Sequence, residues 1–308
     1  MPVLRRSPIT ILSLTLLATS TALFAQSISE LQKLATAGDP QAQFRLGMEY
    51  ASGQNVSFDI AQALAWYRMA AAKGVAEAEY NLAVAYHNGL GVAPDEAESL
   101  RWYQRAAEHG VPDAQFTVGR AYETGHGLPL NRATAIAWYR KAEEKRQYQT
   151  AELALGDMYA TGQGAAKDVA EAMRWYRKAA EAGNLIAQCR LASGYLFGVG
   201  VSADSAQAAA WFRKAAEQGV TFAQSELGSM YESGEGVAQD YAEAYYWMSL
   251  AASFETRPAK RDELSERRDE LASHLAAAML EQTHDRVSKW AEAHNRLDST
   301  TIARHPAQ

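Results

Sequence analysis

Apolar, small and polar residues recur along this chain in one pattern that is copied six times. Each copy contains a tryptophan, and the six lie at spacings of 36, 36, 37, 36 and 36 residues: Trp66, Trp102, Trp138, Trp175, Trp211 and Trp247. An alanine precedes each tryptophan by 24 residues, at Ala42, Ala78, Ala114, Ala151, Ala187 and Ala223. A fixed period of this length predicts a repeat architecture, which overrides the two globular domains that 308 residues would otherwise suggest.

The first half of each copy predicts a helix. In the first copy Ala42, Leu46 and Tyr50 are spaced by four residues, so they share one stripe of a helix with 3.6 residues per turn. A small residue follows the Leu or Val of this stripe in every copy, at Gly47, Ala83, Gly119, Gly156, Ala192 and Gly228. We expect the small side chain to let a neighbouring helix approach closely.

Turn and capping residues separate this helix from a second one. A glycine suited to a left-handed helix end follows each tyrosine by three residues: Gly53, Gly89, Gly125, Gly162, Gly198 and Gly234. A capping residue for the second helix stands seven positions before each tryptophan: Asp59, Asp95, Asn131, Asp168, Asp204 and Asp240. The second helix carries the tryptophan and several alanines. One such hairpin cannot bury its apolar face, but stacked hairpins form a continuous core.

These residues resemble the Sel1-like repeats, relatives of the tetratricopeptide repeats. Their order of residues is A-x-x-x-L-G-x-x-Y-x-x-G-x-G-V, then D, then A-x-x-W-Y-x-x-A-A-x-x-G, and the resemblance covers roughly Ile28 to Phe254. It implies an all-α fold, a right-handed α/α superhelix of six helical hairpins with a C-terminal capping segment. The family's members are mostly adaptors with divergent partners, so the resemblance implies protein binding more than any particular chemistry.

The N-terminal residues predict an export signal. Arg5 and Arg6 precede an apolar stretch from Ile9 to Phe24, and small residues suited to signal peptidase stand at Ala22 and Ala25. A retained membrane anchor is the alternative, but the stretch is short for a bilayer span and is diluted by hydroxyl residues. We therefore expect a cleaved signal, no stable membrane insertion afterwards, and a periplasmic or secreted protein.

The expected domain plan follows from the repeat register. It comprises a signal peptide at 1–25, a capping helix at 26–38, repeats at about 39–74, 75–110, 111–147, 148–183, 184–219 and 220–254, capping helices at 255–296, and a disordered tail at 297–308.

Charge and motifs exclude several classes of function. Without the signal the chain has 28 basic and 36 acidic residues, which disfavours a nucleic-acid or anionic-lipid surface. Cys189, the single cysteine, occupies a column filled elsewhere by apolar residues, so a core position is the simplest interpretation. No nucleophile, phosphate-loop or metal-ligand motif occurs, and we expect neither cofactor nor metal. His274, His284 and His294 are ten residues apart and cannot share one helix face, which favours a solvated helix surface.

Function is then expected at positions that differ between copies. In related solenoids the first helices line the concave surface, and the polar set facing away from the Ala, Leu, Tyr stripe comprises Arg45, Asn81, Asn88, Arg120, Asp157, Arg190, Phe197 and Glu226. Such a mixed surface suits an extended peptide or a partner's helix. Phe197 stands out because its counterparts in the other copies are serine, threonine or asparagine, and an exposed aromatic residue is a candidate hot spot.

Three functions remain open at this point. The main hypothesis is a non-catalytic protein–protein interaction scaffold or adaptor in the bacterial envelope, with a role in signalling, assembly or polysaccharide export. The first alternative is a cell-wall-active enzyme or a β-lactam- or peptidoglycan-binding protein, because some cysteine-rich Sel1-like proteins have been linked to that activity. This chain lacks their paired cysteines. The second alternative is a structural homo-oligomer.

Overall fold

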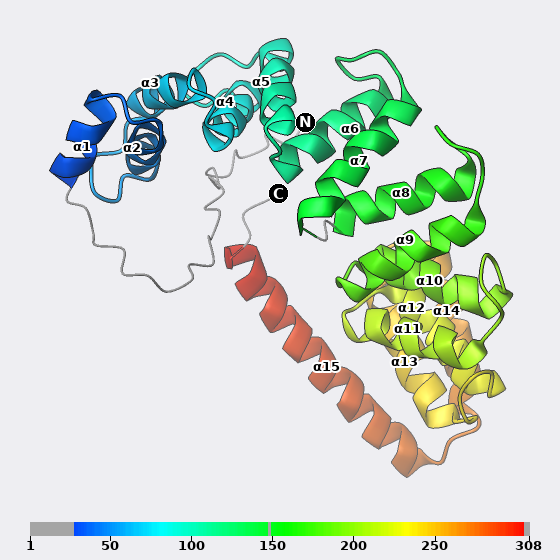
Figure 1. Cartoon of the computed structure of the whole chain (residues 1–308). Coiled ribbons are helices and arrows are strands. Elements are labelled where there is room, and N and C mark those ends of the chain that lie inside the picture. The colour runs from blue at the N-terminus through cyan, green and yellow to red at the C-terminus, as the bar shows by residue number, and fades with distance from the viewer. Residues whose placement is uncertain (1–27, 147–148, 305–308) are drawn as a thin grey trace. The chain divides into compact units, whose positions relative to one another are not determined.

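The computed structural model describes residues 28–146 and 149–304. Within these ranges the regular secondary structure is entirely helical (Figure 1). The chain forms two compact units, one ending at Ala151 and the other beginning at Glu152. The predicted signal peptide at 1–25 lies outside the described residues. No helix in the described ranges is both long and apolar enough to span a membrane.

The N-terminal unit contains a capping helix and three hairpins. Its helices are α1 (Ile28–Thr36), α2 (Pro40–Ser52), α3 (Ile60–Ala71), α4 (Ala76–Asn88), α5 (Glu96–Glu108), α6 (Pro112–Thr124) and α7 (Arg132–Arg146). The first helix of each hairpin packs on the second helix of the same hairpin, as α2 does on α3 and α4 on α5.

The C-terminal unit contains three further hairpins and two added helices. Its helices are α8 (Gln149–Thr161), in which the division between the units falls, α9 (Val169–Glu181), α10 (Leu185–Phe197), α11 (Ser205–Glu217), α12 (Thr221–Ser233), α13 (Tyr241–Phe254), α14 (Pro258–Ala272) and α15 (Ala277–Arg304). Each helix packs chiefly on its neighbours in the sequence, so the predicted all-α solenoid of hairpins is confirmed.

The predicted caps form in every hairpin. The five aspartates that precede second helices each accept a backbone N–H three residues later, at 2.9 to 3.0 Å, and Asn131 accepts that of Thr134 at 3.1 Å. The glycines that end the first helices have φ between 66° and 76°, a region that side chains with a Cβ rarely adopt. Local hydrogen bonds therefore set the length of each helix.

The small-residue column admits a ring from the hairpin's own second helix. A Cβ added at Gly47 would lie 2.6 Å from the ring of Tyr67, and one added at Gly119 would lie 2.8 Å from that of Tyr139. At Gly228 the close neighbours are instead the backbone and side chain of Met248 and the carbonyl oxygen of Ala244. The expected close approach is present, and in the first, third and fourth hairpins an aromatic ring makes it.

A buried glutamine links consecutive hairpins. It follows the repeated alanine, and its Nε2 donates to an alanine carbonyl eight residues earlier at 3.1 to 3.2 Å, in the pairs Gln43 with Ala35, Gln115 with Ala107, Gln188 with Ala180, and Gln224 with Ala216. Each bond ties the first helix of a hairpin to the last turn of the helix before it, at a carbonyl that also accepts the backbone N–H of the glycine three residues later.

The second hairpin carries a carboxylate at the position of this glutamine. The side chain of Glu79 is completely buried; one of its oxygens forms an ion pair with Arg105 at 2.8 Å, and the other lies 2.6 Å from Nδ1 of His109, within hydrogen-bond distance. Arg105 also donates to the carbonyl oxygen of Ala71 at 3.1 Å, the bond that a glutamine supplies elsewhere. The arginine thus takes over the glutamine's donor role and neutralises the carboxylate.

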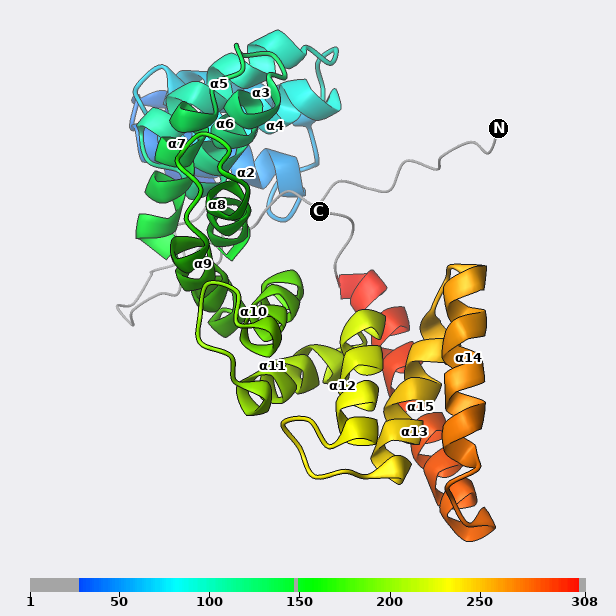
Figure 2. The ribbon, with the colours of Figure 1, turned by 90° about the vertical axis from the view of Figure 1, so that its right-hand side faces the viewer.

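The added helices α14 and α15 cover α13 (Figure 2). Leu264 and Leu271 of α14 pack in one buried cluster with Tyr245 and Met248 of α13. Trp290 of α15 meets Phe254 with ring centroids 5.4 Å apart. Helix α15 continues to Arg304, into the segment 297–308 that was expected to be a disordered tail, and the last four residues of that segment lie outside the described residues.

The three C-terminal histidines make specific contacts, although His274 and His284 are exposed, as expected of a solvated surface. The His274 ring stacks on Tyr241 at 4.5 Å, and His284 Nε2 forms a hydrogen bond with the Tyr245 hydroxyl at 2.5 Å. His294 Nε2 lies 3.1 Å from the carbonyl oxygen of Glu217, which accepts its hydrogen bond. Helix periodicity could not show this, because all three partners belong to the preceding repeats.

Candidate interaction surface

The predicted binding residues lie on first helices of both units. We call the outward side of α2, α4 and α6 the N-terminal first-helix surface, and that of α8, α10 and α12 the C-terminal first-helix surface. The former carries the predicted residues Arg45, Asn81, Asn88 and Arg120, and the latter carries Asp157, Arg190, Phe197 and Glu226.

On the N-terminal first-helix surface, tyrosines of the second helices lie beside predicted residues. Burial raises the pKa of Tyr67 to about 12, and the side chain of Asn81 opposes that shift. Tyr139 donates its hydroxyl hydrogen to Glu123 at 2.5 Å, and burial followed by this bond raises the pKa of Tyr139 while Arg120 lowers it. Both hydroxyls are consequently uncharged at neutral pH.

The remaining two predicted residues of this surface point to solvent. Arg45 is exposed, and Asn88 is exposed with its side-chain amide donating to the carbonyl oxygen of Val84 in the same helix at 3.1 Å. Both are available to a partner.

On the C-terminal first-helix surface, two predicted residues meet in one cluster. Tyr176 of α9 donates to Asp157 of α8 at 2.6 Å, and Arg190 of α10 lies 3.8 Å from the same carboxylate oxygen. Burial, then the hydrogen bond and the charge of Asp157, raise the pKa of Tyr176, while Arg190 lowers it. The cluster joins three helices: Asp157 and Arg190 are charged and partly exposed, whereas Tyr176 is buried.

Sequence reasoning missed the tyrosines that support the two first-helix surfaces. Tyr139 and Tyr176 stand directly after a tryptophan, and the ring of each passes below the small residue of its first helix. A glycine in that column, combined with an aromatic pair in the second helix, is the signal that could have found them. Their hydroxyls position Glu123 and Asp157 through hydrogen bonds.

Phe197 is the most exposed aromatic residue of the C-terminal first-helix surface. Its exposed fraction is 71%, and it is the last residue of α10. Burying such a ring against a partner would remove a large apolar area from water, which is the usual physical basis of a hot spot.

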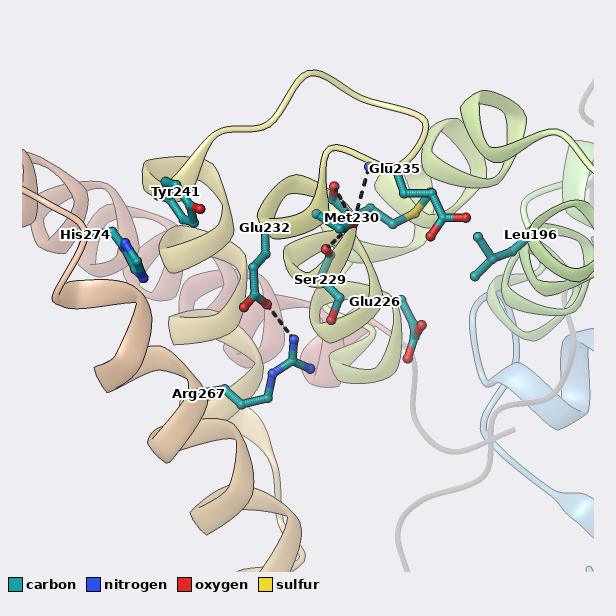
Figure 3. A pocket seen from close by; sticks show the side chains of 10 residues that line it. Leu196, Glu226, Ser229, Met230, Glu232, Glu235, Tyr241, Arg267 and His274 are labelled. Atoms are coloured by element: carbon teal, nitrogen blue, oxygen red, sulfur yellow. Dashed lines mark hydrogen bonds and ion pairs between the residues drawn. The ribbon is translucent and has the colours of Figure 1, made fainter.

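Glu226 lines a groove of about 500 Å³ between α12 and the added helices (Figure 3). The lining consists of carboxylates of α12 and the turn after it, apolar side chains of α10 and α12, and polar groups of α13, α14 and the turn after α14. Arg267 reaches from α14 to Glu232 and forms an ion pair at 2.6 Å. The sequence did not predict this groove because Arg267 and His274, which close one side of it, come from the segment beyond the last repeat.

The structure offers little for covalent chemistry in the described residues. Burial raises the pKa of the Cys189 thiol to about 11, so at neutral pH it is protonated and a poor nucleophile. Within the described ranges no three histidine, cysteine, aspartate or glutamate side chains come together in an arrangement that could hold a metal ion.

Comparison with known proteins places the chain in the family that the repeat pattern resembles. The Sel1 repeat model matches residues 40–75, 76–111, 112–145, 149–184, 185–220 and 221–253. A search of curated proteins found no match.

Two solved structures share more than 30% of their aligned residues with this chain. One is c5321, a protective antigen present in uropathogenic Escherichia coli strains that displays an SLR fold. It has 37% identity and a TM-score of 0.68, with 73% of this chain and 48% of that chain covered. The other is a Sel1 repeat protein from Oxalobacter formigenes, with 34% identity and a TM-score of 0.59, covering 74% of this chain and 100% of that one. The chain thus spans about half the length of c5321.

Proposed function

Because this chain belongs to the Sel1 repeat family, we propose that it is a non-catalytic scaffold or adaptor that binds another protein through its first-helix surfaces. The observation that carries the proposal is the contrast between columns of the repeat. The packing columns keep alanine, leucine, glycine and aromatic residues in copy after copy, whereas the outward positions change in charge, size and polarity. Family membership supports protein binding in general, and these outward residues would select the partner.

We further propose that the protein acts in the bacterial envelope, in the periplasm or outside the cell. The support is the amino-terminal pattern of Arg5, Arg6 and the apolar stretch that follows them. A role in signalling, assembly or polysaccharide export would place its partner in the same compartment.

A capture experiment tests the scaffold function. The protein without residues 1–25 is immobilised and incubated with envelope extract at low salt, and the captured proteins are identified. We expect one specific protein. Replacing Phe197 by alanine should reduce its capture about fivefold or more, because truncating a hot-spot residue costs on the order of 1–2 kcal/mol.

The matched control is Phe58→Ala, which removes another exposed aromatic ring, 62% accessible, from a turn outside the first-helix surfaces. Capture should be unchanged by this substitution. If the folded protein captures nothing specific, the scaffold function is wrong. If Phe197→Ala and Phe58→Ala behave alike, the contact lies on another surface.

A further inference from the structure

The groove on the C-terminal first-helix surface has an excess of negative charge. Glu226, Glu232 and Glu235 line it, whereas Arg267 is the one arginine or lysine among its lining residues. Arg267 is already engaged, because it forms its ion pair with Glu232 at 2.6 Å. Two carboxylates, those of Glu226 and Glu235, therefore face the groove without a paired cation.

The environment of Glu226 favours binding of a positively charged group to its carboxylate. Its side chain is half-buried, and no described residue donates a hydrogen bond to it. Loss of hydration raises the pKa of Glu226, and the more distant charges of Lys260 and Arg267 only partly oppose this effect. A cation placed against this carboxylate would stabilise its charged form, which burial disfavours.

Glu235 lies across the groove mouth on the turn between α12 and α13 (Figure 3). It accepts one hydrogen bond, from the Ser205 hydroxyl at 3.0 Å, which holds the carboxylate in place and leaves its second oxygen open to a ligand. Leu196 of α10 adds apolar surface to the lining, and Met230, which is 2% exposed, packs into the core behind it.

This combination fits a particular side chain. An arginine has an apolar stem that can lie along Leu196, and its planar head carries five donors in directions that match carboxylates. A groove of about 500 Å³ also has room for the residues on either side of that arginine. An anionic ligand would instead meet three carboxylates and one arginine that is already paired.

We propose that this groove binds an arginine side chain of an extended partner segment, held by Glu226 and Glu235 and flanked by apolar residues of the same segment. The inference rests on the proposed scaffold function and names the chemistry of the partner. The contact with Leu196 places the segment next to the end of α10, where Phe197 is exposed.

The test uses two capped pentapeptides, acetyl-Ala-Leu-Arg-Leu-Ala-amide and the same peptide with citrulline in place of arginine. Citrulline keeps the shape of arginine but has no charge. Each is titrated into the isotopically labelled full chain at low salt, and binding is followed by the NMR shifts of the Ser229 and Ser233 amides beside the groove. We expect the arginine peptide to bind at least tenfold more tightly than the citrulline peptide, with a difference that shrinks as salt is added.

Variants assign that difference to the groove. Glu226→Gln should weaken binding of the arginine peptide at least fivefold and leave the citrulline peptide unaffected. Glu281→Gln, which removes an exposed carboxylate from α15, should change neither. The proposal is overturned if neither peptide binds, if both bind equally, or if Glu226→Gln and Glu281→Gln give the same affinity.

The same variant separates this inference from the scaffold function. A partner captured from envelope extract by the wild type and lost with Glu226→Gln supports both. A partner retained with Glu226→Gln leaves the scaffold function standing and refutes the arginine groove. Absence of any captured partner refutes the scaffold function, whatever the peptides show.

Discussion

The buried carboxylate of the second hairpin allows the repeat's packing rule to be tested quantitatively. Replacing Arg105 by alanine removes the ion pair at 2.8 Å and the donor to the Ala71 carbonyl, and leaves the completely buried Glu79 with His109 alone. Breaking a fully buried pair costs about 3–5 kcal/mol. Since the Arg105 side chain is 45% exposed and His109 remains, we expect a loss of about 2–3 kcal/mol in the free energy of unfolding.

A second substitution should rescue most of this loss. With Glu79→Gln the second hairpin acquires the side chain that four other hairpins use, and its amide can donate to the Ala71 carbonyl as Gln115 does to Ala107. In that background Arg105→Ala should cost only about 1 kcal/mol, chiefly the loss of the guanidinium packed 4.7 Å from the centre of the Trp102 ring. The expected coupling energy between the two positions is thus about 1–2 kcal/mol.

The assay is a double-mutant cycle by urea unfolding at pH 7, followed by circular dichroism and tryptophan fluorescence. Amide hydrogen exchange in α4 and α5 is measured alongside, because hairpins of a solenoid can open separately. Arg101→Ala is the control. Its guanidinium pairs with Glu98 at the surface and is 72% exposed, so the loss should stay below about 0.5 kcal/mol. Equal costs of Arg105→Ala in the two backgrounds would refute the reasoning.

Two further predictions concern buried titratable groups. Tyr67 is 3% exposed and has a pKa of about 12 against 10 in the unfolded chain, so the native state keeps a proton that the unfolded state releases. Stability should fall above pH 10, with Tyr67 contributing about 1.4 kcal/mol per pH unit up to pH 12, and Tyr67→Phe should flatten urea midpoints measured from pH 9 to 11.5. An unchanged slope would exclude this cause. The Cys189 thiol, with its pKa raised to about 11 by burial, should react with a thiol reagent at pH 8 far more slowly in the folded protein than in urea. Equal rates would show that the thiol is accessible.

The fold was predictable because the repeat's determinants are local. The N-caps such as Asp59 and Asp204 act on amides three residues away, and glycines such as Gly53 end the helix in which they stand. Six copies of these short-range signals define six hairpins without knowledge of any distant contact. The structure and the family match confirm that prediction.

The candidate surface was predictable only as a set of outward positions. The sequence placed Asp157 and Arg190 on the same side of their helices, but their approach to 3.8 Å depends on how α8 and α10 pack, and the Tyr176 hydroxyl arrives from a third helix. Whether these residues bind a partner stays a prediction.

By itself, the sequence determined the number of hairpins, the ends of their helices and the outward position of Phe197, because each depends on residues within a few positions along the chain. Only the tertiary structure decided the partners of Glu79, the contacts of the three histidines and the groove beside Glu226. Arg267 and Glu232, which meet across that groove, are 35 residues apart. Their meeting depends on the angle at which α14 packs on the last hairpin, and no periodic pattern encodes that angle because α14 lies outside the repeat.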